Sequence, residues 1–539
     1  MRMTRARPVW ARQANLSGML SSLIVANLAV AGTGYLKDLL VASYLGTGAM
    51  GDAFTTSYFV VDLVGSVVFG SAVGVATAST FGALSAEKSW PEFRSQVVKT
   101  LGGVCLVSIL AMSVVWALRG PLLHPFSADG DAYGRMKILY LSLLPMVGFY
   151  PVYFFVSGVL QASGKYVLSV LAPATLNTVV VLVGVALLRW HVPVYSGVLV
   201  LTLSISAGSI ITAAVVLIAW TSWARKVHAV PSAVPSTVPL PHAGALRKGL
   251  NDTLMRLWRL VGGYALYLLL LQGLGLVERY IIATLPTGSL AAFTYAVRLE
   301  QVPNWVFVSS IGTLFLPHLA RAFQKEEWSE FGAMLDRGVD FCVAITLPMA
   351  IVFVVLRTPI VQILFQRGAF DSTSTGLTSA FVSGFAVAIL FQALAAFFLR
   401  VAAGTARLAT PIVITAVSGI CAVVFDVLFI SHLGAITLGL GEGVAGVVTT
   451  VLMWSYLRRR TFWRYKVHIT KVRGIFLSNL VVTGMSCGIL VLYNRFIEKT
   501  NGLSKFLLLG VCLVAVAAVY GFLLWRTLNK VVRGRGKYA

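Results

Sequence analysis

Residues 16–54 read LSGMLSSLIVANLAVAGTGYLKDLLVASYLGTGAMGDAF and indicate the class of fold. The run stays apolar for longer than the roughly 18 residues that a membrane-spanning helix needs. It nevertheless contains Lys37 and Asp38, and Asp52 follows where this apolar run passes into the next. A charge at the centre of a bilayer costs about 2.5–3.5 kcal/mol on insertion scales, so such residues face a bundle interior or a water-filled cavity. The stretch therefore predicts a membrane protein with a polar interior.

The composition of the whole chain agrees with this prediction. The 539 residues are 58% hydrophobic and only 12% charged, and the mean hydropathy is +0.85. A transmembrane β-barrel is excluded, because its strands alternate polar and apolar residues and do not give continuous apolar runs. We predict an all-α polytopic membrane protein.

The pattern of the first apolar stretch returns in the second half of the chain. Glu278 and Arg279 lie in one apolar run there, and Arg298 lies in the next. Two related halves that both open with charged helices are typical of a transporter with a central polar cavity. We count about 14 spans, near 19–45, 54–84, 97–118, 137–160, 166–189, 195–221, 258–284, 290–318, 338–365, 376–402, 408–431, 435–457, 474–496 and 504–527.

The Pro-rich segment 230–241 separates the sixth span from the seventh and lacks helix potential. It predicts two pseudo-repeated six-helix lobes with an addition at the C-terminal end. The predicted parts are an N-terminal lobe (1–221), a Pro-rich and basic cytoplasmic linker (222–257), a C-terminal lobe (258–457), and two extra helices with a basic tail (458–539).

The net charge of +24 is carried mainly by short loops between apolar runs and by both ends of the chain. This distribution favours anionic phospholipids as partners and argues against nucleic acid. The more basic set of loops lies on the same side as both termini, which predicts that both termini are cytoplasmic. The first apolar run is too long for a signal peptide and is interpreted as a retained helix.

No catalytic constellation stands out in the sequence. The seven histidines and five cysteines form no metal-ligand spacing, and no Walker A motif is present. We therefore predict a protein that is not an enzyme, has no bound cofactor and does not use ATP as its driving force.

Four segments resemble the MurJ/MviN family of the multidrug/oligosaccharidyl-lipid/polysaccharide (MOP) exporter superfamily. The first is Lys37-Asp38 followed by Gly46-x-Gly48-x-x-x-Asp52-Ala53-Phe54. The others, in chain order, are the segments 158–165, 295–303 and 364–370, which read GVLQASGK, YAVRLEQVP and LFQRGAF. The resemblance implies a flippase that carries lipid II, the undecaprenyl-linked peptidoglycan precursor, across the bacterial cytoplasmic membrane by alternating access. It also implies a role in cell-wall synthesis and cell shape.

The chain departs from the family pattern at three positions near the first two helices. Ala31 and Gly65 stand where the family carries arginine, and Gly70 stands where it carries an acidic residue. The alternatives are therefore a flippase for an exopolysaccharide or teichuronic-acid precursor, a MATE-like drug antiporter, or a transport-inactive scaffold that recruits cell-wall synthesis enzymes.

The candidate substrate-binding residues follow from the charge that each brings to a membrane span. A lipid-linked oligosaccharide has an anionic pyrophosphate, which arginine binds bidentately and lysine binds as a point charge. The alternative roles are structural: buried ion pairs, snorkelling ends, or an N-terminal helix cap at Asp52. The predicted set is Lys37, Asp38, Asp52, Glu278, Arg279 and Arg298.

A second group of charges comprises Asp426 in the eleventh span and Glu442 in the twelfth. Asp426 resembles the position near which the family is thought to bind sodium. Two carboxylates on adjacent helices are suited either to hold Na⁺ or to share a proton. Alternatively, Asp426 sits near the end of its helix in interfacial water.

Overall fold

The computed structural model describes residues 16–87, 89–127, 130–228, 243–405, 409–461, 465, 469–497 and 502–535. These residues form helices and short connections, without a strand, so the predicted all-α class is confirmed. The first half contains α1 (Leu16–Leu45), α2 (Ala49–Asp62), the π-helix η2 (Leu63–Gly70), α3 (Ser71–Glu87), α4 (Trp90–Ala117), α5 (Arg119–Leu123), the 3₁₀-helix η3 (His124–Phe126), α6 (Gly130–Ala162), α7 (Tyr166–Leu171), α8 (Pro173–Arg189) and α9 (Val194–His228).

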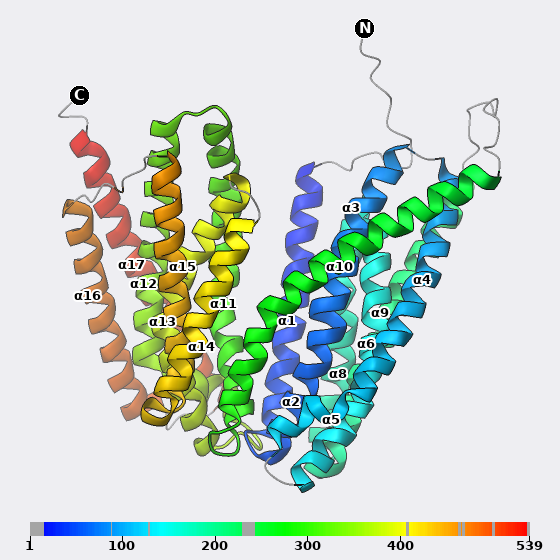
Figure 1. The fold of residues 1–539 in the computed structure, drawn as a ribbon. Helices are drawn as coiled ribbons and strands as arrows, with labels where there is room; N and C mark the ends of the chain where they lie inside the picture. Colours follow the sequence, from blue (N-terminus) through cyan, green and yellow to red (C-terminus); the bar gives the residue numbers. More distant parts are fainter. Residues whose placement is uncertain are drawn as a thin grey trace. The chain divides into compact units, whose positions relative to one another are not determined.

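The second half continues the helical pattern (Figure 1). It contains α10 (Ala243–Ile282), α11 (Ser289–Gln324), α12 (Trp328–Phe365), α13 (Ser372–Thr405), α14 (Ala409–Leu433), α15 (Ile436–Thr461), α16 (Ile469–Leu492), the π-helix η4 (Tyr493–Ile497) and α17 (Gly502–Arg535).

Twelve helical segments in the described part of the chain are long and apolar enough to cross a membrane. They match twelve of the predicted spans in order, beginning with Ser21–Leu45 and ending with Leu507–Leu524. The two other predicted spans coincide with α10 and α11, which are continuous helices of 40 and 36 residues.

The chain divides into two units by its internal contacts. Unit 1 comprises residues 1–45 and 49–272, and unit 2 comprises residues 46–48 and 273–539. The division differs from the predicted boundaries, because residues 258–272 group with unit 1. Of the predicted linker, residues 222–228 belong to α9 and residues 243–257 belong to α10, whereas residues 229–242 lie outside the described residues.

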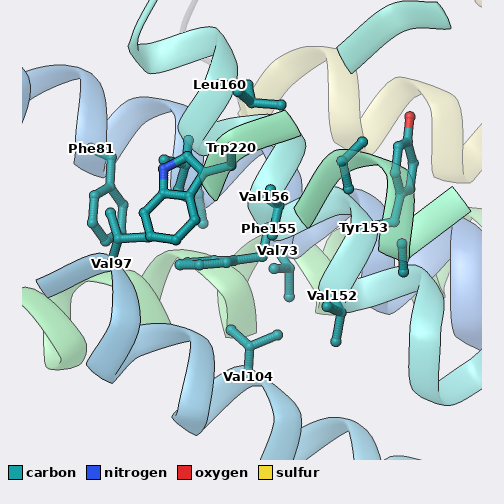
Figure 2. Close-up of a cluster of buried hydrophobic side chains, with 14 of the residues drawn as sticks. Val73, Phe81, Val97, Val104, Val152, Tyr153, Phe155, Val156, Leu160 and Trp220 are labelled. Carbon is teal, nitrogen blue, oxygen red and sulfur yellow. The ribbon is translucent and has the colours of Figure 1, made fainter. Parts of the chain in front are cut away.

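The core of unit 1 is aromatic and aliphatic (Figure 2). Phe81 meets Phe155 edge-to-face, with ring centroids 5.7 Å apart, and Val97 and Trp220 belong to the same buried cluster. Leu257 of α10 is fully buried in this cluster, which explains why α10 up to Gln272 groups with unit 1.

Unit 2 has a second core built around Phe331, Phe397 and Phe398, all buried. Beside it, α13 and α15 cross through small residues. Gly446 is close enough to α13 that an added Cβ would lie 2.8 Å from the Phe391 carbonyl carbon. Small residues allow such close backbone approach, which drives helix packing in membranes where the lipid is as apolar as the side chains.

The two added helices pack on α12 through tyrosine hydroxyl groups. Tyr493 donates to the Gln362 side-chain oxygen at 2.8 Å, and Tyr520 of α17 donates to the Ala344 carbonyl. Tyr465, between α15 and α16, donates to Asp340 Oδ1 at 2.6 Å. Hydroxyl donors are strong in apolar surroundings, so these three bonds fix the addition to unit 2.

Candidate functional site

Lys37 is a buried cation of unit 1. It lies in α1 with only 8% of its surface exposed, and its Nζ is 3.3 Å from Asp38 Oδ1. The same ammonium lies 5.5 Å from the centre of the Tyr58 ring on α2, within the range of a cation–π interaction. The flexible four-carbon stem of lysine lets the ammonium reach both its sequence neighbour and an adjacent helix. Lys37 is thus held by a carboxylate and an aromatic face in a membrane span.

Tyr58 and Asp62 are residues of this region that the sequence did not single out. Both lie on α2, and both side chains interact electrostatically with the Tyr150 hydroxyl group of α6. Asp62 ends α2 directly before η2. π-helical segments are rare and occur often at functional sites, because the wider turn re-aims the side chains beside it. An acidic residue inside the second span was the available sequence signal.

The two glycines that depart from the family pattern have a packing role in η2. A Cβ at Gly65 would lie 2.9 Å from the Val147 Cα of α6, and a Cβ at Gly70 would lie 2.5 Å from the Phe154 ring. Both glycines therefore sit against a neighbouring helix, where this backbone leaves no room for a long side chain. The cations of unit 1 near this point are accordingly fewer than the resemblance implies.

Asp52 lies in the first turn of α2 and is half-buried. A carboxylate in the first turn interacts favourably with the helix N-terminus, which is the structural alternative considered above. Its position also places it at the end of the span that carries Tyr58 and Asp62. Asp52 thus belongs to unit 1 together with Lys37 and Asp38.

Arg279 is a half-buried cation of unit 2. Its guanidinium donates to Thr294 Oγ1 on α11 at 3.2 Å and lies 5.5 Å from the centre of the Phe293 ring. These contacts keep the end of α10 against the start of α11.

Arg298 lies about one turn after Thr294 on α11 and is also half-buried. It donates to the Gln301 side-chain oxygen at 3.3 Å. Glu300, only 7% exposed, is a second acidic residue that the sequence did not single out. Its charge interacts with Glu442, which connects the helix that carries Arg298 to the acidic group on α14 and α15.

Asp426 and Glu442 come together in unit 2 with Glu278. Asp426 is 2% exposed, and its Oδ1 has no hydrogen-bond partner within the part of the chain that the structure describes. Glu442 accepts a hydrogen bond of 2.9 Å from the Gln392 amide of α13. The charge of Glu278 interacts with both Glu442 and Asp426. Asp426 is therefore buried rather than in interfacial water.

Gly441 makes room for Asp426. A methyl group at Gly441 would overlap the Asp426 carboxylate, so the carboxylate packs directly on the backbone of α15. Among the described residues, no group of three or more histidine, cysteine, aspartate or glutamate side chains could hold a metal ion. Any cation bound here would therefore need backbone or hydroxyl oxygens in addition to the carboxylates.

The predicted residues fall into two sets. Unit 1 holds Lys37, Asp38 and Asp52, and unit 2 holds the others, with the Glu278, Asp426 and Glu442 carboxylates interacting with one another. Long apolar helices in two units, with buried charges of both signs in their spans, define a polytopic membrane transporter.

The comparisons identify the family. The model of the lipid II flippase MurJ family matches residues 41–512, and the chain belongs to this family. Members of this family are transporters rather than enzymes, and the function is transport across the membrane.

Individual relatives agree with this assignment. The chain is 25% identical to the probable lipid II flippase MurJ of Rhizobium tropici, over 90% of each chain. A solved structure of lipid II flippase MurJ in an inward closed conformation matches with a TM-score of 0.70 and 17% identity, over 95% of this chain and 99% of that one. An inward-facing MATE family multidrug transporter matches with a TM-score of 0.65 and 14% identity, over 81% and 98%. These two likenesses concern the fold.

Proposed function

We propose that the chain moves a polyprenyl-pyrophosphate-linked oligosaccharide, lipid II, across the bacterial cytoplasmic membrane by alternating access. The observation that carries the proposal is the presence of buried or half-buried cations in long helices of both units: Lys37 in unit 1, and Arg279 and Arg298 in unit 2. Membership of the family supports lipid II as the first substrate to test.

The physical reason lies in the polar head of such a lipid. Each polar group that enters hydrocarbon without a partner costs several kcal/mol, about 2–7 for a neutral group. A guanidinium offers two parallel donors to a phosphate, and an ammonium offers a compact charge. Lys37 already has Asp38 at 3.3 Å, so a phosphate would compete with that carboxylate for the ammonium. Asp38 therefore keeps Lys37 neutralised when no substrate is present and releases it on binding.

We further propose that the carboxylates of unit 2 couple transport to a cation gradient. Asp426 supplies a buried carboxylate oxygen without a partner among the described residues, and Glu442 lies near enough for the charges to interact. Carboxylate oxygens are suited to Na⁺ together with backbone oxygens, and two neighbouring carboxylates are equally suited to share one proton. Gln392 orients Glu442 in either case.

The proposed topology places both termini in the cytoplasm. Exposed basic residues such as Arg458 and Arg459 at the end of α15 would then lie at the cytoplasmic face, where anionic phospholipids attract them. Cell-wall synthesis enzymes are the proposed protein partners, because they supply and consume the lipid precursor.

Genetic complementation tests the substrate and the cations together. The chain is expressed in bacteria depleted of their own lipid II flippase, and growth and cell shape are recorded. We expect rescue by the parent chain, and loss of rescue by Lys37→Ala and Arg298→Ala. Lys99→Ala and Arg321→Ala are the matched controls, because both residues are exposed and Arg321 lies on the same helix as Arg298. Immunoblots establish that all variants are present in equal amounts.

The outcomes separate the alternatives. Rescue that survives both substitutions would show that the cations are structural. Absence of rescue by the parent chain would favour a different lipid-linked glycan, a drug, or a scaffold role without transport.

The coupling ion is tested in proteoliposomes that contain fluorescent lipid II. An inward or outward gradient of Na⁺ is imposed at constant pH, and a pH gradient is imposed at constant Na⁺. Asp426→Asn and Glu442→Gln should abolish the response to the effective gradient and leave basal flipping in place. A response that persists in both variants would contradict the assignment of these residues.

A further inference from the structure

Helix α12 of unit 2 contains two prolines inside a membrane span, Pro348 and Pro359. Proline has no backbone N–H, so it withholds the hydrogen bond that the carbonyl four residues earlier would otherwise accept. At Pro348 that carbonyl belongs to Ala344, and both residues are buried. A backbone carbonyl without a donor is costly inside a membrane, where no water replaces the missing bond. The Ala344 carbonyl therefore needs a donor from outside its own helix.

Tyr520 of α17 supplies this donor. Its hydroxyl donates to the Ala344 carbonyl, and its side chain is buried. In an uninterrupted helix each inner carbonyl already accepts from the N–H four residues later, so a tyrosine on a neighbouring helix meets an acceptor that is already in use. The Ala344 carbonyl lacks that helical donor because residue 348 is proline. The hydroxyl of Tyr520 thus takes the place of a backbone N–H of α12.

The other added helix, α16, packs against both α12 and α17 (Figure 1). Its buried positions are three or four residues apart, so they lie on one face of the helix. They include Asn479, Val482, Ser486 and Ile489, and the stripe continues to Tyr493 at the start of η4. Tyr493 donates to the Gln362 side-chain oxygen of α12 at 2.8 Å. The two added helices are therefore bonded to α12 at residues 344 and 362, which lie about 27 Å apart along an ideal helix.

The second proline of α12 has a local solution. Leu356 leaves the helical conformation, with φ −101° and ψ +16°, and the Arg357 guanidinium donates to the Val354 carbonyl at 2.8 Å. Next to Pro359, α12 thus adjusts its own backbone and uses its own side chain. Next to Pro348 the backbone keeps helical dihedral angles, and the substitute donor comes from α17. Pro348 is therefore the point at which α12 depends on the added helices.

We propose that Tyr520 is a positioning residue for transport: it donates the hydrogen bond that Pro348 withholds from Ala344, and α17 thereby fixes the course of α12. The two added helices are then a working part of the transporter rather than an attachment to it. The consequence for transport rests on the proposed transport function.

The course of α12 bears on the candidate site through α13. A Cβ at Gly338 of α12 would overlap the Phe397 ring of α13, so the two helices are in direct contact there. The same α13 carries Gln392, which donates to Glu442 at 2.9 Å. A displacement of α12 would therefore act on the helix that orients the Glu442 carboxylate.

A double-mutant cycle tests the link between Tyr520 and Pro348. Tyr520→Phe removes the hydroxyl and keeps the ring, and Pro348→Ala restores an N–H that can donate to the Ala344 carbonyl. Flipping of fluorescent lipid II in proteoliposomes and the melting temperature in one detergent are measured for the parent chain, both single variants and the double variant. In the parent background we expect Tyr520→Phe to slow flipping several-fold and to lower the melting temperature by about 2–6 °C. In the Pro348→Ala background the same substitution should change the rate by less than about twofold and the melting temperature by about 1 °C or less.

Tyr493→Phe is the matched control. It removes the same group from the same addition, but its acceptor, the Gln362 side chain, does not depend on a proline. The effects of Tyr493→Phe should therefore be equal in the two backgrounds. A cost of Tyr520→Phe that is equally large in both backgrounds would overturn the proposal, because Tyr520 would then be an ordinary packing residue. A parent rate of flipping in Tyr520→Phe would overturn it as well, whatever the melting temperature does.

Two further outcomes have defined meanings. If Pro348→Ala alone abolishes flipping, the melting temperatures make the same comparison between the two backgrounds and decide it. Failure of the proposed function is recognised separately, because then the parent chain itself does not flip lipid II. The role of Tyr520 in transport falls with that function, whereas the melting temperatures still decide whether its hydroxyl replaces the bond that Pro348 withholds. Equal shifts in both backgrounds would contradict this replacement.

Discussion

The crossing of α13 and α15 gives a sharp prediction about stability. An alanine methyl at Gly439 would lie 2.6 Å from the Gly384 Cα and closer still to the Phe385 backbone nitrogen, whereas ordinary contact begins at 3.4 Å. The helices must therefore separate by at least 0.8 Å at this point, because backbone atoms cannot rotate away. Gly443, one turn later on α15, is the matched control: its methyl would lie 3.5 Å from the Ala388 Cα, which is ordinary contact.

The expected difference in stability between the two variants follows from this comparison. Overpacking costs about 1–3 kcal/mol, and a clash between two backbones belongs at the upper end, about 3 kcal/mol. The gain of about 1 kcal/mol for alanine over glycine in a helix is common to both variants and cancels. At about 2 °C per kcal/mol for a unit of this size, Gly439→Ala should melt about 6 °C below Gly443→Ala.

Thermal unfolding of the purified proteins in one detergent measures the difference. Gln392 of α13 donates to Glu442 of α15 at 2.9 Å across the same pair of helices, so a wider spacing of the helices would weaken this bond. The response of flipping to a cation gradient should therefore fall in Gly439→Ala and persist in Gly443→Ala. Equal melting temperatures for the two variants would refute the reasoning from backbone approach.

Three other predictions concern single side chains. Gly441→Ala should lower the response to the cation gradient as Asp426→Asn does, with little change in melting temperature, because the methyl meets the end of a side chain rather than a backbone. Tyr465→Phe should make the melting temperature less dependent on pH in alkaline buffers. Burial, and then the bond to Asp340, raise the pKa of Tyr465. The contribution of its neutral hydroxyl to stability is therefore complete below pH 10 and is lost as the pH rises above it. Asp371→Ala should lower the melting temperature at neutral pH, because it removes the carboxylate that caps the start of α13 by accepting from the Ser374 N–H, whereas Asp371→Asn should keep this cap. The Ser374 N–H lowers the pKa of Asp371 below 3.8, so only the parent chain loses the stability from the cap as the pH falls through that lowered pKa. Equal melting profiles in acid for the parent chain and Asp371→Asn would contradict the cap.

The membrane class and the spans could be predicted because hydrophobicity is a local property. A run such as Ser21–Leu45 exceeds the thickness of a bilayer by its own length, whatever it packs against. The candidate cations Lys37 and Arg298 could be found for the same reason, since a charge inside an apolar run is visible without a structure. The bounds of the linker could not be predicted from the sequence. The helices extend over residues 222–228 and 243–257 because of contacts such as the burial of Leu257 in the core of unit 1.

The partners of the site residues depended on the fold. Tyr58 beside Lys37, and Gln392 beside Glu442, come from other helices, and helix rotation and tilt are set by packing rather than by sequence spacing. Glu300 was passed over because one more carboxylate in a helix that already carries Arg298 gives no signal until α15 lies beside it.

The sequence by itself determined an all-helical membrane protein of two related halves, the family to which it belongs, and the charges that its spans carry. Those properties follow from local hydrophobicity and from motifs that can be read along the chain. Only the tertiary structure decided that Asp426 is buried on Gly441, that Gly65 and Gly70 face a neighbouring helix, and that Gly46–Gly48 belongs to the second unit. The reason is that close backbone approach and buried hydrogen bonds join residues far apart in the chain, and these contacts exist only once the helices have packed.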